Sequence, residues 1–492
     1  MESLADTLWD VVICGTGLQQ SLLALALSRS DKKVLHIDPN DFYGGAEAAF
    51  SLQEVESWVE KVETGKEGLF RAASVEKLEG DTGLSFPRAY SLALAPQLIH
   101  ARSALLSQLV SSRAYRQVEF LAVGSFSIFK PSPDPSQHSA LVRIPSTRED
   151  VFSTTAISAK AKRGLMKFLK FVLDYESNPQ TDTWHPHADA PLTEFLLKEF
   201  KMDKELQTYI ITLTLSLDGK INTRDGLAVI RRHLSSMGMY GPGFAALYPK
   251  WGGLSEIAQV SCRAGAVGGA VYMLGTGVKT MNDQENPVVI ELTSGDTIKT
   301  RKVVRASENA TDNTGINRLV AIVGSPLKSL FDSTVEGAPT PAVAIVAFPA
   351  GSLSTAAGEA SQSPVYLSVH SSDTGECPAN QSVLYFTTVS EPGSQELLRR
   401  ALDSFLAAVA GDTVPQCLYK LEYQQRQCSA RSQASGSIFG FAPPTSSLAF
   451  DDSTLQSVHD AWKMVLDDES VEEDYLTFAD REGAMDDDEI YD

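Results

Sequence analysis

The sequence predicts an α/β fold: a dinucleotide-binding (Rossmann) domain into which an all-helical second domain is inserted. The first observation is a buried strand, a glycine-containing turn and a helix near the start of the chain. The second is a block of helical periodicity, roughly residues 146–236, with strand-rich sequence on both sides of it. A chain of 492 residues, 43% of them hydrophobic, is long enough to bury the cores of two such units.

The opening strand, turn and helix follow the dinucleotide-binding pattern and depart from it at one position. Val11 to Cys14 reads as a buried strand, Gly15 permits a tight turn, and Gly17 lets the backbone approach a pyrophosphate at the start of the next helix. A second strand ends at Asp38, at the right spacing for a ribose contact. However, Gln20 stands where the motif requires its third glycine. We therefore expect the scaffold without its cofactor, with Gly15, Gly17 and Asp38 as a vestigial motif.

Helical periodicity dominates the middle of the chain. Ser146 and Glu149 form a capping box, which predicts a helix start just before Phe152. A second helix is expected over residues 159–175, where one apolar stripe is made of Leu165, Phe168, Leu169, Val172 and Leu173. Further helical segments are predicted at residues 95–112, 192–217, 223–236, 396–410 and 455–466, and strands at 118–130, 271–289, 298–304 and 343–348.

The charge of the chain is strongly acidic and unevenly distributed. The formal net charge is −20, which disfavours a nucleic-acid partner because phosphate binding requires clustered Lys and Arg. Residues 467–492 hold thirteen acids and one base, Arg481, so this segment carries −12. A run of this kind is typical of a solvated, disordered tail, and the alternative is a specific docking element.

Several features indicate a soluble, cytoplasmic protein. The five cysteines are scattered and include no Cys-x-x-Cys pair, which suits a reducing compartment and predicts no zinc site. Residues 1–8 carry two acids and no base, unlike a secretory signal peptide. No apolar run approaches the roughly 20 residues that span a bilayer. Any membrane contact is therefore expected to be transient.

Motifs beyond the opening turn point to a family. These are Asp41-Phe42-Tyr43-Gly44-Gly45, Phe86-Pro87-Arg88-Ala89, Gly238-Met239-Tyr240-Gly241 and the block from Tyr248 to Leu274. With them the chain resembles the Rab escort protein and Rab GDP-dissociation inhibitor family, which has a flavoprotein-like, FAD/NAD(P)-binding type of fold without a flavin. The resemblance implies a domain I from residues 1–145 and 237–466, a helical domain II from 146–236, and the acidic tail.

The resemblance also implies a surface that binds a Rab GTPase. Glu256 and Arg263 are seven residues apart, which places both on one side of a helix. In the family a Glu and an Arg at this spacing, a Met ten residues after the Arg, and the Tyr of Tyr-Gly-Gly form the platform. The matching residues here are Tyr43, Glu256, Arg263 and Met273. Read without the family, they are a solvated charge pair, a core Met and a turn Tyr.

Two further sites follow from the resemblance. Escort proteins dock on the α subunit of the Rab geranylgeranyltransferase α/β heterodimer through a Phe and an Arg eleven residues later, matched here by Phe152 and Arg163. Helices of domain II part to admit a geranylgeranyl chain, and the stripe residues Leu165, Phe168, Leu169 and Val172 are the candidates to bind it. The alternatives are that Phe152 is a core residue, Arg163 a surface charge, and the stripe simply a helical core.

The Phe and Arg pair favours the escort branch of the family. An escort protein is a non-catalytic accessory component that binds Rab in its GDP form, presents it for prenylation, shields the lipid and delivers the product to membranes for vesicle transport. Three alternatives remain open: a Rab GDP-dissociation inhibitor, a flavin oxidoreductase, and a structural scaffold. An oxidoreductase would retain flavin on purification, and a scaffold would bind neither Rab nor lipid.

Overall fold

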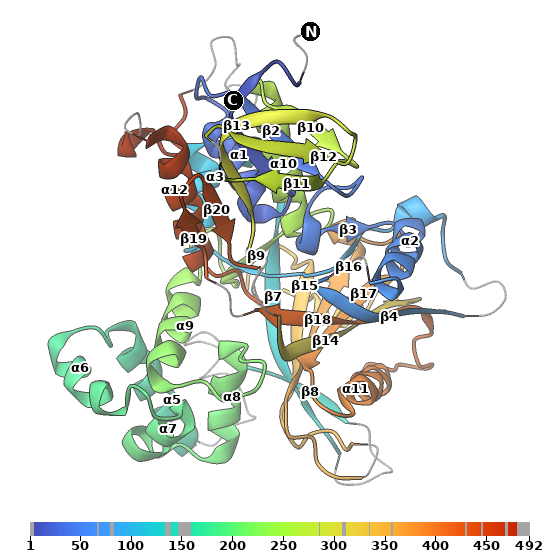
Figure 1. Ribbon diagram of the computed structural model, residues 1–492. Coiled ribbons are helices and arrows are strands. Elements are labelled where there is room, and N and C mark those ends of the chain that lie inside the picture. Colours follow the sequence, from blue (N-terminus) through green and yellow to red (C-terminus); the bar gives the residue numbers. More distant parts are fainter. Residues whose placement is uncertain are drawn as a thin grey trace, which may run out of the picture.

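Two large β-sheets and a separate group of helices make up the protein (Figure 1). The computed structural model describes the chain apart from residues 1–3, 66–67, 79–82, 133–138, 146–158, 285, 308–310, 334, 356–357, 429–430, 444–445, 468–470 and 480–492. One sheet and its covering helices lie at the top of the view, the second sheet lies at the lower right, and the helical group lies at the lower left.

The first sheet contains the opening strand and has the order β10-β2-β1-β13-β12-β11, with β20 beside β13 and β19 beside β20. Its centre is parallel, as the dinucleotide-binding pattern predicts, whereas β12 runs antiparallel to both of its neighbours, β11 and β13. The strands are β1 (Leu8–Cys14), β2 (Val34–Asp38), β10 (Val271–Leu274), β11 (Val278–Asn282), β12 (Val288–Leu292), β13 (Thr297–Ala306), β19 (Gln433–Ser435) and β20 (Ile438–Phe441).

The second sheet was not expected as a separate sheet, because strand patterns identify strands and not their partners. It is a mixed sheet of ten strands that shares none with the first sheet. Its strands are β4 (Phe70–Lys77), β6 (Ile99–His100), β7 (Phe120–Lys130), β8 (Ala140–Arg143), β9 (Ala246–Pro249), β14 (Thr311–Val323), β15 (Val343–Phe348), β16 (Val365–Ser371), β17 (Ser382–Val389) and β18 (Cys417–Cys428). A short pair, β3 (Ala49–Phe50) and β5 (Leu92–Ala93), lies apart from both sheets.

Helix α1 (Leu18–Leu27) is buried on all sides, since each of its ten residues is buried. It packs against the first sheet and between α10 (Leu254–Val267) and α12 (Ser453–Leu466). This explains why the segment is apolar all round rather than on one stripe. Because α1 is packed between the first sheet and these two helices, the glycine turn between the end of β1 and the start of α1 is held in a fixed position.

The helical group consists of α5 to α9, which follow one another between residues 159 and 236. Their apolar faces share one core with β7, β15 and β16 of the second sheet. The helices are α5 (Ala159–Leu173), α6 (Asn178–Trp184), α7 (Leu192–Phe200), α8 (Lys204–Thr214) and α9 (Thr223–Ser236). The other α-helices in the described residues are α2 (Leu52–Glu63), α3 (Ala104–Ser111) and α11 (Ser394–Ala408). The helix predicted from the capping box at Ser146 lies outside the described residues.

Two helix predictions need correction. The helix expected over residues 95–112 begins only at α3, where Ser103 caps it by accepting a hydrogen bond from the Leu105 N–H at 3.2 Å. The residues before it include β6, whose two residues pair with β9. The segment 192–217 is two helices, because Lys201 has a φ of 53° and Asp203 caps a new helix. In the first segment, strand pairing with β9 replaces the expected start of the helix. In the second segment, the chain turns at Lys201 although the helical periodicity of the sequence continues.

The described part of the acidic segment after residue 466 is not a solvated tail. Leu476 is 1% exposed and Phe478 is 9% exposed, and both belong to the core around α1 and α12. The Phe478 N–H donates to the Ser111 carbonyl at 3.0 Å. Residues 471–479 therefore pack on the helices that cover the first sheet, because two apolar side chains in this run outweigh its charge.

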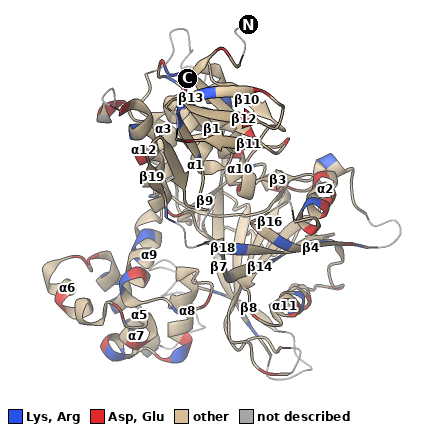
Figure 2. Cartoon of the chain, in the orientation of Figure 1, with Lys and Arg blue, Asp and Glu red and all other residues tan. Residues whose placement is uncertain are grey.

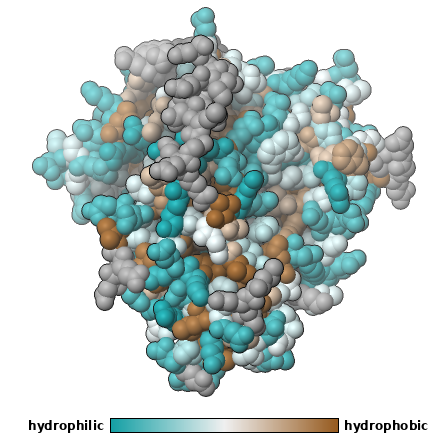
Figure 3. All heavy atoms as spheres, turned by 90° about the horizontal axis from the view of Figure 1, so that it is seen from above, coloured by the Kyte–Doolittle hydropathy of each residue, from teal (hydrophilic) through white to brown (hydrophobic). Residues whose placement is uncertain are grey.

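Figure 2 shows acidic and basic residues along α2, α9 and α11. On the face seen from above, hydrophobic and hydrophilic side chains are mixed, and hydrophobic atoms form small patches separated by hydrophilic side chains (Figure 3). In the part of the chain that the structure describes, no helix is both long enough and apolar enough to cross a bilayer.

Candidate functional site

The glycine turn after β1 has the backbone geometry of a dinucleotide-binding turn. Gly15 has a φ of 93°, a conformation that favours glycine, and its N–H donates to the Ile37 carbonyl of β2 at 2.7 Å. Gly17 is the N-cap of α1. The N-terminus of α1, the positive end of the helix dipole, is where a pyrophosphate would bind.

The acid predicted to contact a ribose is already engaged within the protein. Asp38 is 2% exposed, and one of its carboxylate oxygens accepts hydrogen bonds from the N–H and the hydroxyl of Thr16, each at 2.7 Å. The other oxygen accepts from the Asn40 N–H at 2.8 Å. Asp38 therefore ties the glycine turn to the end of β2, with its accessible lone pairs used internally.

Two side chains of the protein fill the space in front of the turn. A Cβ atom at Gly17 would lie 3.1 Å from the amide oxygen of Gln20 and 3.6 Å from a carboxylate oxygen of Glu47. Glu47 is buried, and its carboxyl lies close to the backbone of Leu18 at the start of α1. Burial raises the pKa of Glu47 to about 7. The side chain of Glu47 thus lies where a pyrophosphate would meet the helix.

These contacts do not fit a flavin dinucleotide. Glu47 lies where the pyrophosphate would bind, the acid expected to contact the ribose is hydrogen-bonded to Thr16, and Gln20 covers the glycines. The departure from the glycine motif predicted that Gln20 would obstruct the cofactor site, whereas the sequence analysis did not identify Glu47 as a second obstructing side chain. The available sign was that Glu47 is the one charged residue between Phe42 and Gln53.

Tyr43 lies beside the helix that carries the two predicted platform charges. Gly44 and Gly45 both have positive φ values, 97° and 52°, so the chain turns sharply after Tyr43. A Cβ atom at Gly44 would lie 3.3 Å from Ser255 Oγ in the first turn of α10. Burial, together with the neighbouring Cys262 thiol, raises the pKa of Tyr43. The tyrosine is therefore near α10 and half-exposed.

The structure brings three of the four predicted platform residues to one side of the first sheet. Glu256 is half-buried, which raises the pKa of its carboxyl, and Arg263 is exposed two turns further along α10. Met273 is on the edge strand β10, but packs with Leu35 and Ile37 against the opposite face of the sheet. Tyr272 is the β10 residue that faces α10: its pKa is raised by burial and by the nearby Cys262. Met273 is thus at the same edge but not on the same face.

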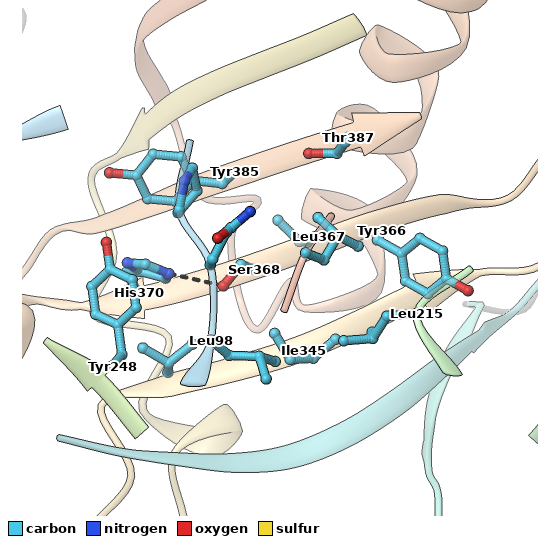
Figure 4. Close-up of a pocket in the computed structure, with 14 residues that line it drawn as sticks. Leu98, Leu215, Tyr248, Ile345, Tyr366, Leu367, Ser368, His370, Tyr385 and Thr387 are labelled. Carbon is cyan, nitrogen blue, oxygen red and sulfur yellow. Dashed lines mark hydrogen bonds between the residues drawn. The ribbon is translucent and has the colours of Figure 1, made fainter. Parts of the chain in front are cut away.

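A buried polar network that sequence reasoning missed fixes the segment leading into α10. The fully buried carboxylate of Glu376 accepts hydrogen bonds from the hydroxyls of Tyr248 at 2.6 Å and Tyr385 at 3.0 Å, and lies 2.6 Å from His370 Nδ1. Figure 4 shows His370 between the two tyrosine rings. Because Tyr248 is on β9, shortly before α10, the network connects the second sheet to the platform helix.

The same network has the distances of a hydrolase triad. Ser368 Oγ is 2.8 Å from His370 Nε2, and His370 Nδ1 is 2.6 Å from Glu376. The adjoining pocket, however, has a volume of about 20 Å³, room for about one water molecule. An acyl substrate does not fit beside this serine. Together with the two tyrosines bound to Glu376, this makes the network structural.

The helical sites predicted from the resemblance are only partly visible. Phe152 lies outside the described residues, and Arg163 is exposed on α5. The four candidate lipid-binding residues lie in the shared core: Leu165, Phe168 and Val172 are at most 3% exposed, and Leu169 packs against them. A groove of about 440 Å³ between α8 and the end of β15 contains none of the four. These four residues therefore form a helical core in this conformation, whereas Leu173, the fifth residue of the predicted stripe, is 52% exposed at the end of α5.

Within the described ranges, no group of three or more His, Cys, Asp or Glu side chains is arranged to hold a metal ion. The four cysteines whose side chains are described, Cys14, Cys262, Cys377 and Cys417, are free thiols. Burial raises the pKa of each of these thiols, which favours the unreactive protonated form.

The fold and site define a class of protein: a dinucleotide-binding type of fold whose cofactor turn is filled by its own side chains. Comparison with known proteins specifies the family. Residues 5–335 match the family described as GDP dissociation inhibitor, and the chain belongs to this family.

Relatives with 31% identity include "Rab proteins geranylgeranyltransferase component A" of Saccharomyces cerevisiae, over 79% of this chain, and of Candida albicans, over 80%. The match spans 62% and 60% of the length of these two relatives. The crystal structure of a Rab GDI from Plasmodium falciparum aligns with 94% of this chain and 99% of its own, with a TM-score of 0.67 and 18% identity. An oxidoreductase from Methanosarcina mazei aligns with 92% of this chain and 99% of its own, with a TM-score of 0.58 and 12% identity. The two structures support the fold predicted from the sequence.

Proposed function

We propose that this protein is a Rab escort protein. It binds a Rab GTPase in the GDP form, presents it to Rab geranylgeranyltransferase, shields the attached lipid and delivers the product from the cytosol to membranes. The observation that carries the proposal is that two relatives named component A of the transferase share 31% identity with this chain over 79% and 80% of its length. Other relatives named component A or Rab escort protein share 25–27% identity, and relatives named GDP dissociation inhibitors share 25–26%. The prediction of an escort protein from Phe152 and Arg163 agrees with the two relatives at 31% identity.

In the proposed role the protein is an accessory component and not an enzyme. Glu47 and Gln20 stand where a dinucleotide would bind, which removes the redox chemistry of the fold. The pocket beside Ser368 and His370 has room for about one water molecule, which argues against hydrolysis there. Binding, rather than bond making, is the activity that these residues support.

The Rab-binding surface is proposed at Tyr43, Glu256 and Arg263, with Met273 at the adjoining sheet edge. Tyr43 and Arg263 combine an aromatic ring with a guanidinium, the residue types that dominate interface hot spots. The buried Glu376 network stabilises the position of this surface, because it fixes the segment of chain that leads into α10.

Charge reversal at this surface tests its position. Arg263→Glu is expected to weaken Rab·GDP binding by about 1 to 3 kcal/mol, roughly 5- to 150-fold in Kd. The measurement is titration calorimetry with unprenylated Rab·GDP, with a melting curve for each variant. Lys328→Glu is the matched control, since Lys328 is exposed just after β14 of the second sheet. Equal affinities of wild type and a folded Arg263→Glu variant would show that the platform is elsewhere.

Lipid shielding is proposed for the helical group. A geranylgeranyl chain is costly in water, since each buried CH₂ contributes about 0.8 kcal/mol. The stripe of Leu165, Phe168, Leu169 and Val172 offers an apolar surface once the helices part. Because three of these side chains are at most 3% exposed, binding requires α5 to separate from its neighbours, and the lipid then packs against the apolar side chains that this separation uncovers.

Reconstituted prenylation tests the whole proposal. Unmodified Rab·GDP, geranylgeranyl diphosphate and the purified transferase α/β heterodimer are combined with and without this protein. We expect transfer of lipid to Rab only when the protein is present. A Rab GDP-dissociation inhibitor, the second candidate favoured by the family description, would extract prenylated Rab from membranes and leave this reaction unchanged.

A further inference from the structure

A cleft lined by four arginines lies beside the proposed platform. Its lining comes from the end of α1, the segment after α3, the outer side of α10 and the described part of the acidic segment. The charged residues in the described lining are Arg29, Arg113, Arg116 and Arg263, all of them basic. The cleft has a volume of about 300 Å³. In a chain with a net charge of −20, four arginines gathered in one lining form an unusual anion-attracting surface.

The acidic segment enters this cleft as one of its walls. The aromatic ring of Phe478 lines the cleft, and the guanidinium of Arg29 lies 5.0 Å from the centre of that ring. Arg29 also donates a hydrogen bond to the carbonyl of Ala479 at 3.1 Å. Arg29 therefore holds Ala479, the residue directly before the remaining acidic stretch, at the cleft.

The stretch that follows, residues 480–492, has the complementary charge. It contains seven carboxylate side chains and one arginine, a net charge of −6, and four of the acids are consecutive, from Asp486 to Glu489. The four acids lie seven to ten residues beyond Ala479, a distance of up to about 23 to 33 Å when the chain is extended, which is long enough for them to reach the arginines of the cleft. Attachment at the rim keeps their effective concentration in the millimolar range, and weak individual ion pairs then suffice.

We propose that residues 480–492 bind in this arginine cleft and compete with Rab for Arg263. The binding itself depends only on the charges described, whereas the competition depends on the proposed function of Arg263. Rab would then displace the acidic segment when it binds, and the segment would disfavour other acidic proteins at this surface. An anionic membrane surface is the competing occupant for the same four arginines.

The first experiment measures the binding directly. The chain ending at Ala479 is titrated with a fluorescent peptide of residues 480–492 at low ionic strength. We expect saturable binding that weakens as salt is raised, because exposed charges are screened. Binding should be lost with a peptide in which the acids are replaced by Asn and Gln, and weakened at least threefold by Arg116→Glu. A melting curve shows that this variant is folded, and Arg116→Gln is the milder second variant.

The second experiment measures the competition. Removing residues 480–492, or neutralising Asp486 to Glu489 in the full chain, is expected to tighten Rab·GDP binding by about three- to tenfold. Absence of peptide binding, or equal binding by the Arg116 variants, would overturn the proposed site. The same holds if the shortened chain binds phosphatidylserine vesicles but not the peptide. Unchanged Rab affinity after removal of the segment would overturn the competition, and no Rab binding by any chain would instead refute the proposed function.

Discussion

Replacing Phe152 with alanine is expected to weaken recruitment of the transferase to the Rab complex by about thirtyfold or more. A buried aromatic side chain in a partner's pocket commonly contributes about 2 kcal/mol or more. Arg163, eleven residues further on, is exposed on α5 and is able to form the paired hydrogen bonds typical of guanidinium contacts. Binding of Rab alone should be unchanged, because Tyr43, Glu256 and Arg263 belong to the first sheet and its helices.

The measurement pairs two affinities on the same variant: Rab·GDP for this protein, and the transferase for the binary complex. Leu197→Ala is the matched control, since it also removes a large apolar side chain from the helical group, and Leu197 is 55% exposed on α7. A core role for Phe152 would lower the melting temperature and damage both affinities together. Unchanged recruitment by a folded Phe152→Ala variant would exclude this residue as the anchor.

Stability is expected to fall as pH rises from about 4.5 to about 7 because of Glu47. In the folded protein burial raises the pKa of this carboxyl from its ordinary value of 4.5 to about 7. The unfolded chain releases the proton first, so the folded state binds more protons within this window. The folded state therefore loses stability as pH increases, by about 3 kcal/mol once the pH is above the folded pKa.

Glu47→Gln tests this pH dependence. Glutamine remains neutral, so the variant should match wild type near pH 4, below the unfolded pKa, and exceed it by up to about 3 kcal/mol near pH 8. Urea unfolding at both pH values measures the difference. Glu60→Gln is the control, since Glu60 is exposed on α2. If wild type were more stable to unfolding than Glu47→Gln at the higher pH, the raised pKa of the buried Glu47 carboxyl would be contradicted.

The elements of this protein that depend on local sequence were predictable. The run Val11 to Cys14, the glycines after it and the apolar stripe of α5 each favour one backbone conformation through neighbouring residues. Positive φ at Gly15 and the period of α9 follow from the same local rules. The family resemblance came from short motifs of this kind, and the match over residues 5–335 confirms it.

Other features were decided only by the tertiary structure. The lone pairs of Asp38 are used by Thr16, 22 residues away, and Glu47 reaches the start of α1 only because the turn at Gly44 and Gly45 folds back. The division of the strands into two sheets, and the burial of Phe478 against Ser111, depend on pairings between distant segments. Periodicity and spacing describe a residue's own element, whereas burial and hydrogen-bond partners depend on which elements the chain brings together.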